Sequence, residues 1–135
     1  MAEPIRIAAA LIEDGAGNLL LVRKRGTAAF MQAGGKIEDG ESPYDALVRE
    51  LHEELGYTTE ADATCHIGRF SAEAANEPGR VVEAELFRIF RRRQAFVLGA
   101  EIDEAIWVTP ESAAGLELAP LTRLCVLPLA RSTFR

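Results

Sequence analysis

The sequence has little of what marks several specialised classes of protein. It contains only two cysteines, Cys65 and Cys125, which is too few for a disulfide framework, so we expect buried, reduced thiols. No apolar run approaches the length of a membrane-spanning helix. The N-terminal residues show no cleavable signal pattern. These absences favour a cytoplasmic protein with no membrane partner.

An excess of positive charge is also missing. The chain has 15 lysines and arginines against 21 aspartates and glutamates, for a net charge of -6. Because the phosphate backbone of nucleic acids recruits basic protein faces, this balance argues against a polymeric nucleic acid as partner. An acidic protein can still bind a phosphorylated small molecule if metal ions screen the repulsion. Solubility alone is the simpler explanation of the charge.

The length and composition are those of one globular domain over residues 1–135, with 48% hydrophobic and 27% charged residues. Residue patterns predict strands over 4–13, 19–25, 58–70, 81–90 and 101–108, turns at 15–18 and 76–79, and an irregular segment over 26–40. Helices are predicted to start at Ser42-Pro43 and at Pro110 and to cover 121–129. Strands interleaved with helices indicate an α+β fold in which a mixed sheet is sandwiched between helices.

The helix that starts at Ser42-Pro43 and stops at Gly56 carries the most informative residues. At about 100° per residue, Glu50, Glu53 and Glu54 share an arc of about 100°. Like charges at this spacing destabilise a helix, and a bound cation would offset that cost. Oxygen ligands favour magnesium or manganese. A solvated acidic helix face is the alternative explanation.

The residues around these glutamates form a longer pattern at fixed spacing. The order is Gly35, five residues, Glu41, seven residues, Arg49-Glu50-Leu51, one residue, Glu53-Glu54, one residue and Gly56. This pattern resembles the Nudix box of the MutT-like Nudix hydrolases, closely over residues 35–57 and loosely elsewhere. Two positions differ from the usual pattern: Ala33, where members often have proline, and Tyr57, where the box usually closes with an aliphatic residue.

The resemblance implies a Nudix fold and metal-dependent hydrolysis of a diphosphate bond in a nucleotide derivative. It implies Mg²⁺ (or Mn²⁺) as the cofactor, held by Glu50, Glu53 and Glu54, with the Gly34 or Gly35 carbonyl as an extra ligand. Arg49 would orient a carboxylate, and the structural positions of the box would be Gly35, Glu41 and Gly56.

The base that activates water varies within the family that the box resembles. Some members use a box glutamate and others use a carboxylate from a later loop. In this chain Glu101 is the leading loop candidate and Glu104 is the next, with an ordinary exposed loop acid as the alternative for both.

Arg23 and Arg25 lie on one face of the predicted second strand, because alternate residues of a strand point the same way. One of them is a candidate ligand for a substrate phosphate. Cations at strand ends are common, so a purely solvated arginine is the alternative.

The substrate is less well specified by the sequence. Markers of the ADP-ribose, diadenosine polyphosphate and coenzyme A subfamilies are missing, and residues 119–122 lack the asparagine with which some members read an oxidised guanine base. We therefore expect a nucleotide pyrophosphohydrolase, with a housecleaning role as one option. A nucleotide-sugar (ADP-sugar type) hydrolase and a non-catalytic nucleotide-binding or regulatory module are alternatives, and homodimer formation is left open.

Overall fold

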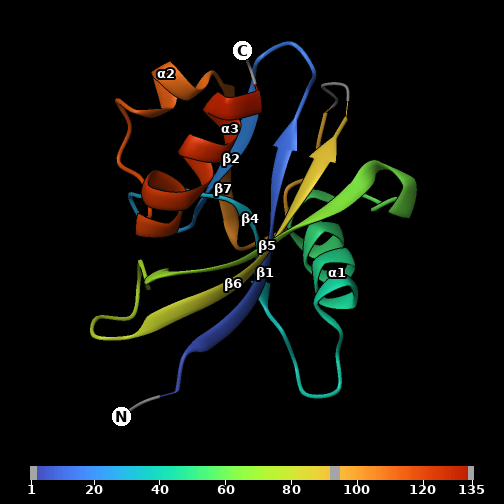
Figure 1. The fold of residues 1–135 in the computed structure, drawn as a ribbon, viewed down its shortest axis with the longest axis vertical. Coiled ribbons are helices and arrows are strands. Elements are labelled where there is room, and N and C mark those ends of the chain that lie inside the picture. Colours follow the sequence, from blue (N-terminus) through green and yellow to red (C-terminus); the bar gives the residue numbers. More distant parts are fainter. Residues whose placement is uncertain (1–2, 92–94, 134–135) are drawn as a thin grey trace.

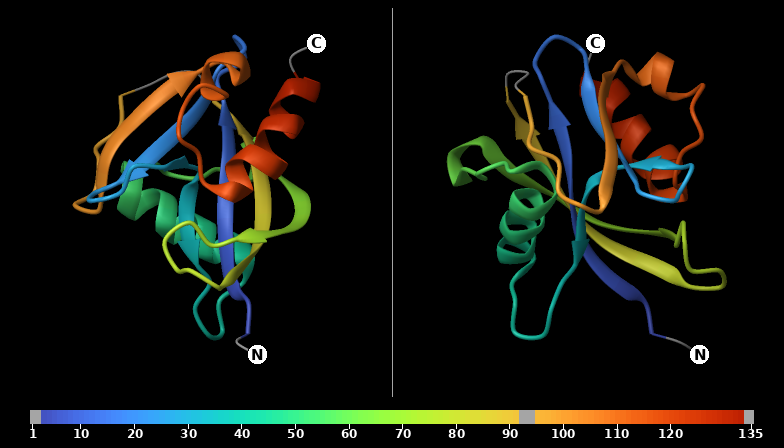
Figure 2. Two further views of the ribbon diagram at one scale, coloured as in Figure 1. Left: turned by 90° about the vertical axis from the view of Figure 1, so that its left-hand side faces the viewer. Right: turned by 180° about the vertical axis from the view of Figure 1, so that it is seen from behind.

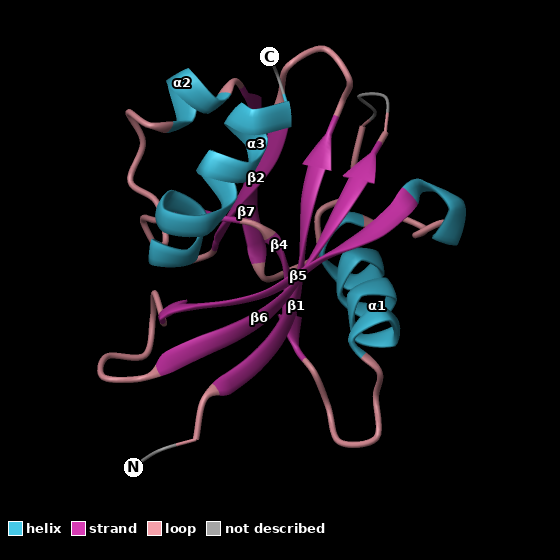
Figure 3. Ribbon diagram, viewed as in Figure 1, coloured by secondary structure: helices cyan, strands magenta, loops and turns pink. Residues whose placement is uncertain are grey.

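The computed structural model describes residues 3–91 and 95–133, which form a seven-stranded mixed sheet with helices against both faces (Figure 1). The strands are β1 (Ile5–Glu13), β2 (Leu19–Lys24), β3 (Phe30–Met31), β4 (Ala33–Lys36), β5 (Thr64–Glu73), β6 (Val81–Phe90) and β7 (Ile102–Val108). The helices are α1 (Pro43–Leu55), α2 (Pro110–Ala113) and α3 (Leu127–Thr133), with a 3₁₀ turn at Ala61–Ala63 and a π turn at Thr122–Val126 (Figure 3).

Strand β1 is the centre of the sheet. Along one edge it pairs in parallel with β6 from Ile5 to Glu13. Along the other edge it pairs antiparallel with β4 and, through Glu13 and Leu19, with β2. Strand β7 extends the sheet beside β2, and β5 does so beside β6. The turned views in Figure 2 show these strands fanning out from β1.

Alternate residues of β1 contribute to two separate hydrophobic cores. Ala8, Ala10 and Ile12 pack in the core that contains the apolar face of α1. Ala9 and Leu11 pack in the core that contains residues of α2 and α3. Because successive side chains of a strand point to opposite faces, the sheet separates α1 from α2 and α3. The predicted α+β sandwich is confirmed.

Helix α1 has the predicted limits. The Ser42 hydroxyl accepts a hydrogen bond from the Asp45 amide at 3.1 Å, and Pro43 is the first helical residue. Gly56 ends the helix in the left-handed conformation, with φ of 65°. The predicted apolar stripe is buried: Leu47 and Leu51 are 0% exposed and Leu55 is 1% exposed.

Two segments differ from the expected secondary structure. The segment 26–40 is not irregular throughout, since it contains β3 and β4. These short strands carry no alternating pattern, and they form because β1 and β2 supply hydrogen-bonding partners. The extended structure expected over 58–70 starts only at Thr64 and continues to Glu73.

The C-terminal helical region runs to Thr133, beyond the predicted end at 129. Both cysteines are free, but Cys65 is exposed, so its predicted burial is wrong. Within residues 3–91 and 95–133, no helix is long and apolar enough to cross a membrane.

Candidate active site

The three glutamates of α1 show a graded exposure to solvent. The Glu53 side chain is 59% exposed, the Glu50 side chain is 15% exposed, and Glu54 is 5% exposed. This gradient follows from their helical arc, which begins on the outer face of α1 and ends against β4. The arc therefore brings charged oxygens to the boundary between solvent and the sheet, instead of leaving them on a fully solvated face.

The Glu54 carboxylate is fixed by the backbone of β4. Its Oε1 accepts a hydrogen bond from the Gly34 amide at 2.9 Å. Burial raises the pKa of Glu54 to about 7, although the Gly34 amide and the positive charge of Lys24 act in the opposite direction. A carboxyl group with this pKa has a strong preference for a neutralising partner near neutral pH.

Glu50 occupies space that a side chain at residue 35 would need. A Cβ atom at Gly35 would collide with the Glu50 carboxylate, and one at Gly34 would collide with the backbone of β1. The two glycines therefore allow β4 to lie close to β1 and α1 at once. Burial also raises the pKa of Glu50, with Arg49 lowering it.

Arg49 connects α1 to the loop before it. Its Nε and Nη2 atoms donate to the two carboxylate oxygens of Glu41 at 2.8 and 2.9 Å, and Nη2 also donates to the Lys36 carbonyl at 3.0 Å. The Arg49 hydrogen bonds lower the pKa of Glu41 to about 2. Arg49 Nη1 lies 3.4 Å from Glu50. This geometry is that of a group that orients a neighbouring carboxylate.

The donor set suits a hard divalent cation in chemical type. Within the described residues, no three histidine, cysteine, aspartate or glutamate side chains already converge closely enough to enclose a metal ion. Magnesium commonly takes one or two carboxylates and completes its shell with water and substrate phosphate. The half-buried carboxylate of Glu50 and the buried carboxylate of Glu54 fit that smaller requirement, and Glu53 is the exposed member beside them.

The two candidate loop carboxylates have different surroundings. Glu104 is bound to Arg23 at 3.3 Å. Glu101 is exposed, and its charge contributes to the raised pKa of Glu54. The loop reaches α1 through backbone hydrogen bonds from Val97 to the Leu55 carbonyl and from Gly99 to the Glu54 carbonyl. Glu101 is therefore the candidate whose charge acts on the glutamates of α1, and its role as base stays a prediction.

The three cations at the end of β2 also differ in their surroundings. Arg23 is bound to Asp103 at 2.8 Å, to Glu104 and to the Thr27 carbonyl, whereas Arg25 is exposed. Lys24, which the sequence did not single out, lines a pocket and acts electrostatically on Glu50 and Glu54. The phosphate contacts predicted for Arg23 and Arg25 stay predictions, and Lys24 is an additional candidate.

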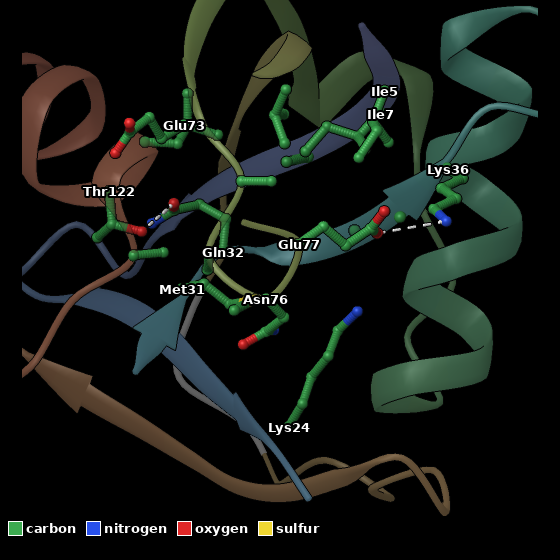
Figure 4. Close-up of a pocket in the computed structure, with 18 residues that line it drawn as sticks. Ile5, Ile7, Lys24, Met31, Gln32, Lys36, Glu73, Asn76, Glu77 and Thr122 are labelled. Atoms are coloured by element: carbon green, nitrogen blue, oxygen red, sulfur yellow. Dashed lines mark hydrogen bonds and ion pairs between the residues drawn. The ribbon is translucent and has the colours of Figure 1, made fainter. Parts of the chain in front are cut away.

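This pocket lies on the other side of Gly34 and Gly35 from the glutamates of α1 and has a volume of about 150 Å³. Figure 4 shows the residues that line it. Gly34 and Gly35, which contact Glu54 and Glu50, also form part of its wall. Other lining residues come from separate parts of the chain and include Gln32, Lys36, Glu77, Val82 and Thr122. Most carry no recognisable sequence signal, because only folding brings them together.

The sequence matches a known protein family and a characterised relative. The NUDIX domain family matches residues 3–127. The chain is 33% identical to the CTP pyrophosphohydrolase of Escherichia coli (strain K12) over 121 residues, which are 86% of this chain and 84% of that protein.

Solved structures give the same result. The MutT protein from Methanosarcina mazei Go1 superposes with a TM-score of 0.79 at 25% identity, over 100% of this chain and 99% of that protein. The Escherichia coli ORF135 protein superposes with a TM-score of 0.68 at 29% identity, over 98% and 89% of the two chains. Members of the family are typically dependent on a divalent metal. The chain belongs to the Nudix hydrolase family, as a MutT-like member of its nucleotide pyrophosphohydrolase class.

Proposed function

We propose that this protein hydrolyses nucleoside triphosphates to nucleoside monophosphates and pyrophosphate with Mg²⁺ (or Mn²⁺), and that CTP is its leading candidate substrate. One structural observation carries the proposal. Gly34 and Gly35 contact the carboxylates of Glu54 and Glu50 on one side and line the pocket on the other. A nucleotide in the pocket would therefore have its phosphates beside the glutamates. The choice of CTP comes from the relative of 33% identity, which is named for that substrate.

In the proposed reaction, a water oxygen forms a bond to phosphorus, the bridging phosphoanhydride bond breaks, and pyrophosphate leaves. The water proton passes to a carboxylate, for which Glu101 is the loop candidate. Glu50, Glu53 and Glu54 would hold the cation, together with the Gly34 carbonyl. When bound, the cation would neutralise phosphate charge and lower the pKa of water.

The residues around the glutamates have positioning roles in this scheme. Arg49 and Glu41 hold the carboxylates of α1 in place through their paired hydrogen bonds. Lys24, Arg23 and Arg25 are the candidates for phosphate contact, and Lys24 is the one in the pocket wall. A cation at that position offsets the repulsion between a triphosphate and an acidic protein.

The direct test is hydrolysis of a substrate panel with magnesium, followed by chromatographic identification of products. The panel contains CTP, the other common nucleoside triphosphates, ADP-ribose and an ADP-sugar. We expect the highest kcat/KM for CTP, release of CMP and pyrophosphate, and no turnover with EDTA. Faster hydrolysis of the ADP-sugars would replace this proposal with the nucleotide-sugar hydrolase. Binding without turnover of any compound would favour the regulatory module.

A further inference from the structure

The pocket beside the glutamates contains a buried side-chain amide with an unused donor. Gln32 lies between β3 and β4 and is 6% exposed. Its Oε1 accepts a hydrogen bond from the hydroxyl of Thr122 at 2.8 Å, and Thr122 is itself 0% exposed (Figure 4). Among the described residues, none accepts a hydrogen bond from Gln32 Nε2.

An amide group in this state is costly. A buried donor without a partner loses its hydrogen bonds to water and gains none in the protein. Most buried polar groups in folded proteins do have a partner, so an exception requires a specific explanation. Gln32 and Thr122 both line the pocket, so a bound molecule can supply the missing acceptor.

The Thr122 hydroxyl determines which end of the amide faces the ligand. Because Oε1 of Gln32 accepts the hydrogen bond from Thr122, its NH₂ group is the part of the amide that can bind a ligand in the pocket. A carboxamide nitrogen donates and does not accept hydrogen bonds. The complementary atom on the ligand is therefore a hydrogen-bond acceptor.

The charge distribution around the pocket indicates which part of a nucleotide reaches Gln32. Lys24 and Lys36 lie on one side of the pocket, where Lys36 is paired with Glu77 at 3.5 Å, and Gln32 and Thr122 lie on the other (Figure 4). The chain neighbours of the amide and the hydroxyl in the pocket wall, Met31 and Leu121, are apolar. Phosphates would be attracted to the cations, and an uncharged aromatic ring would suit the apolar walls beside the amide.

We propose that Gln32 reads the nucleotide base, with Nε2 donating a hydrogen bond to an acceptor on the edge of the ring and Thr122 positioning the amide. The inference rests on the proposed nucleotide hydrolysis and names a residue that binds the base. The acceptor would be a ring nitrogen or carbonyl oxygen without hydrogen, such as N3 or O2 of cytosine. A site built around such a hydrogen bond discriminates against analogues that lack the acceptor.

The test compares CTP with ribose 5′-triphosphate, which has the same triphosphate and sugar without a base. Both are assayed with the wild-type protein and with Gln32→Met, which keeps the side-chain length and removes the amide. We expect kcat/KM for CTP to fall about three- to tenfold in the variant, as for the loss of one hydrogen bond. The value for ribose 5′-triphosphate should not change. An equal change for both substrates, or no change for either, would overturn the inference.

Two further variants separate donation from shape. Gln32→Glu can still accept from Thr122 but cannot donate, so it should lose preference for CTP over ribose 5′-triphosphate as Gln32→Met does. Retained preference in Gln32→Glu would show that residue 32 accepts from the base, and the donor assignment would be wrong. Thr122→Val keeps the side-chain volume and removes the hydroxyl. It should lower the CTP preference by a smaller factor, with an unchanged melting temperature excluding misfolding.

The inference and the proposed function can fail separately. If the wild-type protein turns over CTP while Gln32→Met keeps the same base preference, only the inference is wrong. If the wild-type protein turns over no nucleotide, the proposed function is wrong, and calorimetric binding of CTP and of inorganic triphosphate then tests the inference. Weaker binding of CTP alone in Gln32→Met would support it, and equal CTP binding by both proteins would overturn it.

Discussion

The polar network on α1 and the pocket share Gly34 and Gly35 as a common wall, yet they are built in different ways. The network comes from one short stretch of chain, in which Arg49 binds Glu41 and α1 carries the glutamates. The pocket wall draws on β1, the β2 end, β4, the turn between β5 and β6, and the segment before α3. The candidate catalytic residues are thus encoded locally, whereas the pocket depends on how distant segments meet.

The largest expected effect comes from removing charge in the local network. We expect Glu53→Gln to lower kcat by orders of magnitude on every nucleotide, because it would remove a ligand of the cation. The fold should be unaffected, since the Glu53 side chain is 59% exposed. Steady-state kinetics on CTP and ribose 5′-triphosphate would measure both the loss and the base preference.

The matched control for this change is Asp45→Asn, which neutralises an exposed carboxylate in the first turn of the same helix. It should keep near-normal kcat. If Glu53→Gln lowered kcat but kept the preference for CTP over ribose 5′-triphosphate, the polar network on α1 and the pocket would have separate roles. Near-normal activity in Glu53→Gln would show that this residue is not a ligand.

A smaller loss is expected from the loop that follows β6. Glu101→Gln should lower kcat about 100-fold if Glu101 takes the proton from water, and the acidic limb of the pH–rate profile should disappear. Glu104→Gln is the paired control, because the Glu104 carboxylate already binds Arg23. If both variants behaved alike, the base would have to be sought among the glutamates of α1 itself. A large effect of Glu101→Gln alone would show that the catalytic region extends beyond the box.

The smallest change concerns stability. The pKa of Glu54 is about 7 in the folded protein and 4.5 in its ordinary state, so the folded protein binds more protons between these values. Stability should therefore fall as pH rises from about 4.5 to about 7, by up to about 3 kcal/mol. Glu54→Gln keeps an acceptor for the Gly34 amide and should remove this slope.

Urea unfolding of the metal-free protein at about pH 5 and about pH 8 would measure the difference between wild type and Glu54→Gln. The variant should be the more stable protein at the higher pH only. An identical pH dependence in both proteins would mean that burial does not perturb this carboxyl group in the manner described. In a second measurement, added magnesium should stabilise the wild type more than Glu54→Gln. Binding of the ion to the folded state raises the stability of the protein that holds it better.

Features formed by one stretch of chain could be predicted from the sequence, and features formed by distant segments could not. The limits of α1, the leucine stripe and the identity of β6 could be predicted, because capping residues and periodicity act over short distances. Strands β3 and β4 could not, since they exist through pairing with β1 and β2. The unequal burial of Glu50, Glu53 and Glu54 also depends on where β4 crosses the helix. Gln32 carried no signal, because its role depends on a hydroxyl that is 90 residues away.

Gly99 fixes the distance between α1 and the loop before β7, and so limits how that loop can change during evolution. Its amide donates to the Glu54 carbonyl at 2.9 Å, and any side chain there would collide with the Glu53 carbonyl. Two main-chain hydrogen bonds, from Val97 and from Gly99, thus anchor the segment leading to residue 101 to the end of α1. Substitutions at residue 101 can change the side chain without changing the distance between the main chain at this residue and α1. A lineage could exchange the carboxylate there for another side chain while Gly99 keeps the spacing constant.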